Sequence, residues 1–186
     1  GNGGWHIRSY MFYMQLAVEY DDNPPPIHIG GGEVYGNWIA DTVFIDGGIH
    51  VPHNQSLTIQ EGVTVYFTGS YDFDVYGDLT INGTREDSVK ITSYVDGPGP
   101  SSWTGLRIYD HDHNRAQVTN INFTTIENGQ NGIYYYGVGY DDITPPQHTL
   151  SYSVIQMNSG DGIGIDFDVK ITPVLLVLLD LVFLVF

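Results

Sequence analysis

The 186-residue sequence contains no cysteine and very few basic residues. Without cysteine, the chain has no disulfide bonds, no thiolate metal ligands and no thiol nucleophile. Only six Lys and Arg residues stand against 22 acidic residues, which gives a net charge of −16. Nucleic acids are held mainly by clustered Lys and Arg, so no nucleic-acid partner is expected. The same acidic charge would repel polyuronates, whereas neutral glycans would not be repelled.

Residues that favour helices are also scarce until the final apolar segment, residues 173–186. This segment has fourteen residues and contains Asp180, whereas a transmembrane helix needs about 20 apolar residues. No transmembrane anchor is therefore expected. We expect the segment to pack against the rest of the chain or against a second copy, through Val174, Leu175, Leu178, Leu181, Phe183 and Phe186.

Short apolar runs alternate with turn-forming residues and recur at a regular interval. The motif Leu57-Thr58-Ile59 returns 22 residues later as Leu79-Thr80-Ile81, and Phe67 has an apolar counterpart, Val89, at the same offset. Each short run is closed by Gly, Asn or Asp, which supply the backbone conformations of tight corners. An interval of this length is typical of a solenoid whose coils stack through parallel strands.

A second pair of similar segments lies in the later half of the chain. Residues 122–133 are echoed by residues 151–163, with one residue inserted and an offset of about 30 residues. We expect residues 136–147 to form a loop that accounts for the longer offset. The sequence therefore predicts an all-β protein, a right-handed parallel β-helix. A β-sandwich or jelly roll is the alternative, because these folds also use short strands and turns.

The stretch that carries these motifs resembles bacterial secreted and surface proteins with right-handed parallel β-helix repeats. The likeness rests on residues 57–67 (LTIQEGVTVYF), residues 79–84 (LTINGT) and residues 103–108 (WTGLRI), and it covers residues 36–168. One departure is Thr104, which stands between Trp103 and Gly105. The resemblance implies the fold and an extracellular or cell-surface location. It implies no reaction, because such proteins include adhesins and sugar-active enzymes.

Three regions follow from these patterns. We expect an N-terminal flank or cap at residues 1–35, a parallel β-helix at 36–168 and the apolar C-terminal segment at 169–186. The run Gly30-Gly31-Gly32 is interpreted as a flexible joint. Both ends of a solenoid are open strand edges that need a cover. Residues 10–20 and the apolar tail are the candidate covers, and either of them would make a polymer if it packed on a second copy.

A run of alternating acids and histidines is the candidate metal site. It consists of Asp110, His111, Asp112 and His113, which follow a predicted strand. In an extended chain, alternate residues share one face, so each pair could offer oxygen or nitrogen ligands to a divalent cation such as Ca²⁺. A solvated polar turn explains the same residues equally well.

Aromatic residues are the candidate glycan-binding groups. Sugar rings stack on flat aromatic faces, and the candidates are Trp103, Tyr134, Tyr136 and Tyr140. The three consecutive tyrosines at 134–136 must alternate in a strand, which buries one and exposes two, or the reverse. Structural packing of these aromatics is the alternative interpretation.

No catalytic set is selected by spacing. A glycoside hydrolase needs two carboxylates, which Asp110 or Asp112 and another coil could supply, and a lyase would need a base such as Arg107, Lys90 or Arg115. We therefore expect a non-catalytic extracellular or cell-surface structural protein that self-associates through its solenoid ends and its apolar tail. The alternatives are a carbohydrate-binding or adhesive module and a polysaccharide hydrolase or lyase.

Overall fold

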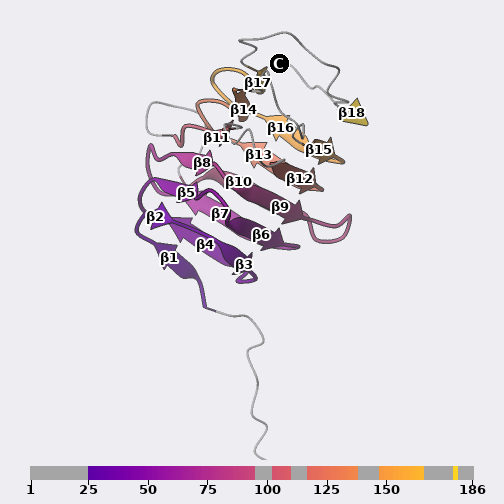
Figure 1. Cartoon of the computed structure of the whole chain (residues 1–186). Helices are drawn as coiled ribbons and strands as arrows, with labels where there is room; N and C mark the ends of the chain where they lie inside the picture. The colour runs from indigo at the N-terminus through magenta and orange to yellow at the C-terminus, as the bar shows by residue number, and fades with distance from the viewer. Residues whose placement is uncertain (1–24, 95–101, 110–116, 138–146, 166–177, 180–186) are drawn as a thin grey trace, which may run out of the picture.

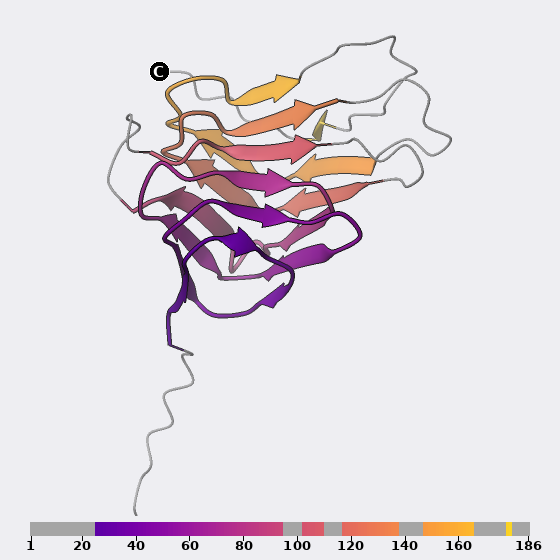
Figure 2. The same cartoon turned by 60° about the vertical axis from the view of Figure 1, so that its left-hand side comes forward.

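The computed structural model describes residues 25–94, 102–109, 117–137, 147–165 and 178–179. In this part of the chain, each coil contributes one short strand to each of three parallel sheets (Figures 1 and 2). The chain is therefore a parallel β-helix. The described part contains no helix long and apolar enough to cross a membrane.

The three sheets are named here A, B and C in the order in which each coil visits them. Sheet A consists of β1 (Ile27–Ile29), β4 (Thr42–Ile45), β7 (Thr64–Phe67), β10 (Val89–Ser93), β13 (Thr124–Glu127) and β16 (Val154–Gln156). Sheet B consists of β2 (Gly32–Glu33), β5 (Ile49–Val51), β8 (Phe73–Val75), β11 (Leu106–Tyr109), β14 (Ile133–Tyr136) and β17 (Ile163–Ile165). Sheet C consists of β3 (Gly36–Trp38), β6 (Ser56–Gln60), β9 (Asp78–Asn82), β12 (Val118–Asn122), β15 (Gln147–Ser151) and β18 (Leu178–Leu179).

The observed register confirms the repeat seen in the sequence. Leu57 lies beside Leu79, and every strand pair in the three sheets is parallel. The second pair of similar segments is also in register, with Asn122 beside Ser151 and Ile133 beside Ile163. Because a sandwich or jelly roll is built from antiparallel strands, this pairing excludes the alternative fold.

The interval of 22 residues holds for only one coil step. On sheet A, Val43 lies beside Val65, but Val65 lies beside Ile91, which is 26 residues later. The expected pairing of Phe67 with Val89 is therefore wrong, because the register places Phe67 beside Ser93. Extra residues are accommodated at the corners between strands, where they leave the stacking of the strands unchanged.

The core is a set of apolar columns that run through the coils. Alternate residues of each strand point inward, as the period of two requires. Val43 and Val65 on sheet A and Leu57 and Leu79 on sheet C are completely buried. Each inward side chain packs on the coil below and the coil above, so a coil buries its apolar groups only when it has neighbours.

The first coil begins earlier than the sequence predicted. Strands β1 and β2 already belong to the stack, although residues 1–35 were assigned to a flank. The glycine run is not a joint. Gly31 and Gly32 have φ angles of 110° and 97°, and a Cβ at Gly47 in the next coil would meet the backbone of Gly30. These glycines therefore form a close-packed corner, which explains why the sequence uses glycine there.

Candidate functional site

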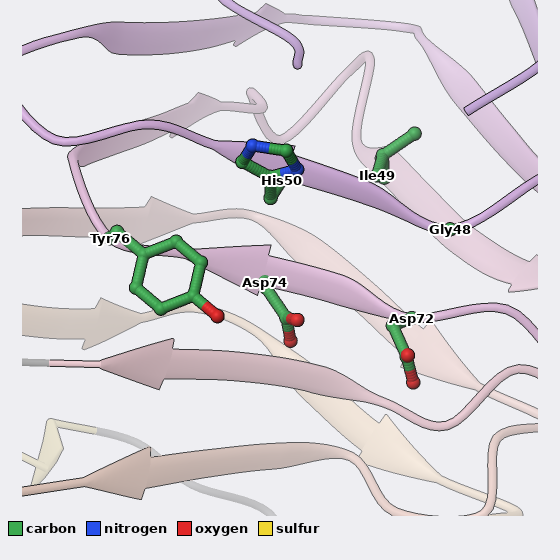
Figure 3. Close-up of a pocket in the computed structure, with 6 residues that line it drawn as sticks. All are labelled: Gly48, Ile49, His50, Asp72, Asp74 and Tyr76. Carbon is green, nitrogen blue, oxygen red and sulfur yellow. The ribbon is translucent and has the colours of Figure 1, made fainter. Parts of the chain in front are cut away.

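A shallow groove on the outward face of sheet B is the candidate site (Figure 3). It has a volume of about 340 Å³ and lies between two coils. Gly48, Ile49 and His50 line it from the coil of β5, and Asp72, Asp74 and Tyr76 line it from the coil of β8. Ile49 points away from the other labelled side chains and into the core.

One outward row of side chains crosses sheet B through the groove. The parallel register places Glu33 beside His50, His50 beside Asp74, Asp74 beside Arg107 and Arg107 beside Tyr134. Their inward neighbours Phe73, Val75, Leu106 and Ile108 are completely buried. The expectation that Asp72 and Asp74 lie on the outward face of a strand edge is therefore in agreement with the structure.

Arg107 joins the two carboxylates of the groove. Its Nε and Nη2 donate hydrogen bonds of 2.6 and 3.0 Å to the two oxygens of Asp74, and Nη2 lies 2.9 Å from Asp72 Oδ1. Burial lowers the pKa of Arg107, but the hydrogen bond and charge of Asp74 and the charge of Asp72 outweigh it, so the pKa rises. The guanidinium thus stays charged and fixes both carboxylates in place.

This ion-pair network decides what the groove can do chemically. A glycoside hydrolase needs one carboxyl group that can donate a proton and another that is free to act as base or nucleophile. Asp74 gives both oxygens to Arg107, and Asp72 Oδ1 also accepts a 2.9 Å hydrogen bond from Thr104 Oγ1. The groove can accept hydrogen bonds, but its two carboxylates are held as counterions for Arg107.

Tyrosine rings form a second outward row, next to the first. Tyr76 stacks on Tyr109 with ring centroids 4.9 Å apart, and Tyr109 stacks on Tyr136 at 4.7 Å. Burial raises the pKa of both Tyr76 and Tyr109, and the negative charge of Asp74 raises it further. Because the rings face one another along the solenoid, this row presents ring edges and phenol groups rather than open faces.

The candidate glycan-stacking residues are not alike in the structure. Tyr134 and Tyr136 are half-buried on the outward side of β14, with ring centroids 4.4 Å apart, while Tyr135 is buried. The predicted alternation of the three tyrosines is therefore confirmed. Since Tyr136 contacts Tyr109 on one side and Tyr134 on another, its ring is largely engaged with protein. Tyr140 lies outside the described residues.

Trp103 must be removed from the candidate glycan-binding residues. Its side chain is completely buried, and its ring stacks on Phe67 with centroids 4.7 Å apart and planes inclined by 16°. Its indole Nε1 donates a 3.1 Å hydrogen bond to the carbonyl of Glu127. A sugar ring cannot reach an aromatic face that is enclosed in the core.

The other predicted site residues lie largely beyond the described part of the chain. Asp110, His111, Asp112 and His113 fall outside it, and the described residues contain no group of three or more potential metal ligands. Of the residues expected to self-associate, only Leu178 is placed, in β18 beside Leu150 of β15. Val174, Leu175, Leu181, Phe183 and Phe186 lie outside the described residues.

The sequence did not reveal the groove, because its charged groups come from coils of unequal length. Asp74 and Arg107 are 33 residues apart, and no repeat in the sequence predicts that separation. Lys90 and Glu127 on sheet A were missed for the same reason, although their side chains form a 2.6 Å ion pair. The only available signal was that each charged residue alternates with buried apolar neighbours.

We expect Arg107→Gln to lower the free energy of unfolding by about 1–3 kcal/mol, because Asp74 would lose two charge-assisted hydrogen bonds in a half-buried setting. Urea unfolding followed by circular dichroism measures the loss. Arg85→Gln is the matched control, since Arg85 is exposed and should change stability by less than about 0.5 kcal/mol. Equal effects of the two substitutions would mean that the Arg107 network adds no stability.

No family model, curated protein or solved structure matches this chain.

Proposed function

We propose that this chain is a non-catalytic structural protein of the bacterial cell surface or exterior that self-associates through the ends of its solenoid. The observation that supports the proposal most is the exposure of inward-facing residues in the first coil. Ile27 continues the column of Val43 and Val65, yet 42% of its surface is exposed, whereas Val43 and Val65 are completely buried. A column that is left open in this way can be closed by another coil.

The strand edges of the first coil lead to the same proposal. Strands β1, β2 and β3 are the terminal strands of sheets A, B and C, so one side of each has no partner in the described part of the chain. Unpaired strand edges can be extended by strands from another molecule. A second copy would continue both the hydrogen-bond ladders and the apolar columns.

The opposite end offers a surface of matching chemistry. Strands β16, β17 and β18 are terminal there, and the inward side chains Ile155, Ile163 and Ile165 are half-buried and pack on the core. A head-to-tail contact between unlike ends does not close on itself when the rotation is open, so it builds a filament. The apolar residues of the tail are proposed to contribute to this contact.

The lack of a free carboxylate pair in the groove favours a structural role over hydrolysis. Asp72 and Asp74 are joined by Arg107, and Glu127 is joined to Lys90 and accepts a 2.8 Å hydrogen bond from Gln156. Charged pairs of this kind on the outer faces of stacked coils link one coil to the next.

Ile27→Lys is the test of the proposed end contact. Sedimentation velocity over a range of concentrations should show multimers of the unmodified chain, and electron microscopy should show them as elongated. The lysine would bury an unpaired charge in the contact, so we expect the variant to shift toward the monomer. Leu175→Lys in the tail should act in the same direction.

Val118→Lys is the matched control for the end contact. Val118 is exposed to a similar degree, 37%, but lies on a side wall of the solenoid rather than at its end. The control should assemble like the unmodified chain. A monomeric unmodified chain at all concentrations, or equal loss of assembly in Ile27→Lys and Val118→Lys, would contradict end-to-end association.

A further inference from the structure

The outward face of sheet C carries very little charge, although the chain as a whole is strongly acidic. Strands β6, β9, β12 and β15 point alternate side chains away from the core across four successive coils. Two rows of outward residues cross these strands in register. The first row is Thr58, Thr80, Asn120 and Thr149, and the second is Gln60, Asn82, Asn122 and Ser151.

These two rows form a regular, accessible array. Neighbouring strands are about 4.8 Å apart, and alternate residues along a strand are about 6.6 Å apart, so the side chains lie on a nearly rectangular grid. Asn82, Asn120 and Thr149 are exposed, and the other members are half-buried. Every member carries a hydroxyl or an amide, and none carries a charge.

Hydrogen bonds within the rows orient their polar groups. Thr149 Oγ1 donates a 2.6 Å bond to Asn120 Oδ1, and Ser151 Oγ donates a 2.8 Å bond to Asn122 Oδ1. With its oxygen occupied in this way, each asparagine keeps its NH₂ group for an outside acceptor, because neither donates to any other described residue. Thr58 and Thr80 likewise have side-chain hydroxyls that bond to no other described residue.

Charge is concentrated on the other two sheets. The outward face of sheet B carries Asp74 and Arg107, and that of sheet A carries Lys90 and Glu127. Beside the two rows of sheet C, the outward charge on these four strands is that of Asp78, whose Oδ1 accepts a 2.9 Å hydrogen bond from the Val118 N–H. The uncharged array is therefore a property of one face rather than of the whole surface.

The composition of this face indicates the chemistry of its partner. Protein interfaces are centred on Trp, Tyr and Arg, and nucleic acid is held by Lys and Arg, but neither row contains any of these residues. A polyuronate would be repelled by the net charge of −16. What remains is an uncharged polymer with hydroxyl groups at regular intervals, because hydroxyls and amides can each donate and accept with such a chain.

We propose that the outward face of sheet C is a docking surface for an extended, neutral polysaccharide. The two rows supply hydrogen-bond donors and acceptors at the spacing of the coils, so a straight chain laid across the strands meets a new pair of polar groups at each coil. This binding is additional to end-to-end association and does not depend on it, since the two surfaces lie on a side and at the ends of the solenoid.

Retention of the full chain on insoluble polysaccharides tests the proposal. The probes are powdered cellulose and chitin, with a polygalacturonate resin as the charged comparison. Thr80→Glu combined with Asn120→Glu places two acids on sheet C at positions that are in register. Thr42→Glu combined with Thr64→Glu makes the matched change on the outward side of sheet A, also in register.

We expect the unmodified chain to be retained by at least one neutral polysaccharide and not by polygalacturonate. The sheet C variant should bind at least about tenfold more weakly, which corresponds to about 1.4 kcal/mol, because its carboxylates would lose water on docking. The sheet A variant should bind like the unmodified chain. Thr80→Val, which removes one hydroxyl and adds no charge, should weaken retention in the same direction and covers the case in which the acidic variant does not fold.

Two results would overturn the proposal. One is failure of the unmodified chain to bind either cellulose or chitin. The other is equal weakening by the sheet A and sheet C variants, which would point to a general effect of charge. Because the assay scores retention and not assembly, the Ile27→Lys variant should bind the polysaccharide normally even if it no longer self-associates.

Discussion

Trp103→Ala should lower the free energy of unfolding by about 3–5 kcal/mol, the largest loss that we expect from a single substitution in this chain. The indole is completely buried and stacks on Phe67. The register explains why a residue of this size is needed there. Phe67 lies beside Ser93 in the next coil, and the small serine leaves space above the phenyl ring that the indole fills.

Polar contacts add to the expected loss at Trp103. Its backbone N–H donates a 3.2 Å hydrogen bond to Ser93 Oγ, and its Nε1 donates to the carbonyl of Glu127. Alanine would leave that buried carbonyl without its donor and would create a cavity between two coils. Urea unfolding measures the change, and Trp103→Phe is the control, because it keeps most of the ring stacking and should lose clearly less. A loss below about 1 kcal/mol for Trp103→Ala would show that the ring does not fill the core.

Acid should destabilise the later coils through His148. Burial lowers the pKa of this histidine from its usual value of 6.5 to about 4. The unfolded chain therefore takes up a proton between about pH 6.5 and pH 4, where the folded chain does not. Its contribution to stability is complete above pH 6.5 and is lost as the pH falls toward 4. The loss is of the order of 3 kcal/mol.

The surroundings of His148 explain the shift and define its control. The imidazole points inward from β15, beside Thr119 of β12, and its ring lies 4.9 Å from the ring of Tyr135 on β14. Both of its ring nitrogens are buried without a hydrogen-bond partner in the described part of the chain. Burial also raises the pKa of Tyr135, so this neighbour stays neutral. No described group there compensates the charge of a protonated imidazole.

Hydrogen exchange of the backbone amides of β12, β14 and β15 measures this effect coil by coil. Their protection should fall between pH 6.5 and pH 4, after correction for the intrinsic pH dependence of exchange, while β4 to β9 keep theirs. His148→Leu should abolish the dependence in this range and raise the stability at every pH, because leucine continues the column of Leu57 and Leu79. The same pH dependence in the leucine variant would assign the effect to other groups.

The fold was predictable from the sequence where coils repeat with equal length and failed where they do not. Leu57 and Leu79 could be aligned because the two coils that contain them have similar strands and corners. The next partner of Leu79 is Thr119, a polar residue that is 40 positions later, and neither its distance nor its chemistry continues the pattern. Parallel pairing of strands does not fix the length of the corners between them, so register across long corners could not be inferred.

The candidate site was less predictable than the fold, because single residues were judged without their neighbours in the next coil. A tryptophan that follows a masked loop and precedes a strand can point either way, and only the small Ser93 above Phe67 makes the core the better place for it. Arg107 was considered as a possible base, but its partners Asp72 and Asp74 become visible only once the coils are stacked. Solenoid side chains function in rows, and rows run across the sequence.

Engineered disulfides test the stacking of the coils most directly, and the absence of native cysteine makes the assay clean. Thr80 and Asn120 lie side by side on neighbouring strands, whereas Thr80 and Thr149 are separated by the strand that carries Asn120. A disulfide requires Cα atoms within about 7 Å of each other, and two coil steps span about 9.6 Å. Under mild oxidation, Thr80→Cys with Asn120→Cys should form an intramolecular disulfide, and Thr80→Cys with Thr149→Cys should not. Bridging of the second pair but not the first would contradict a stack of parallel coils in this order.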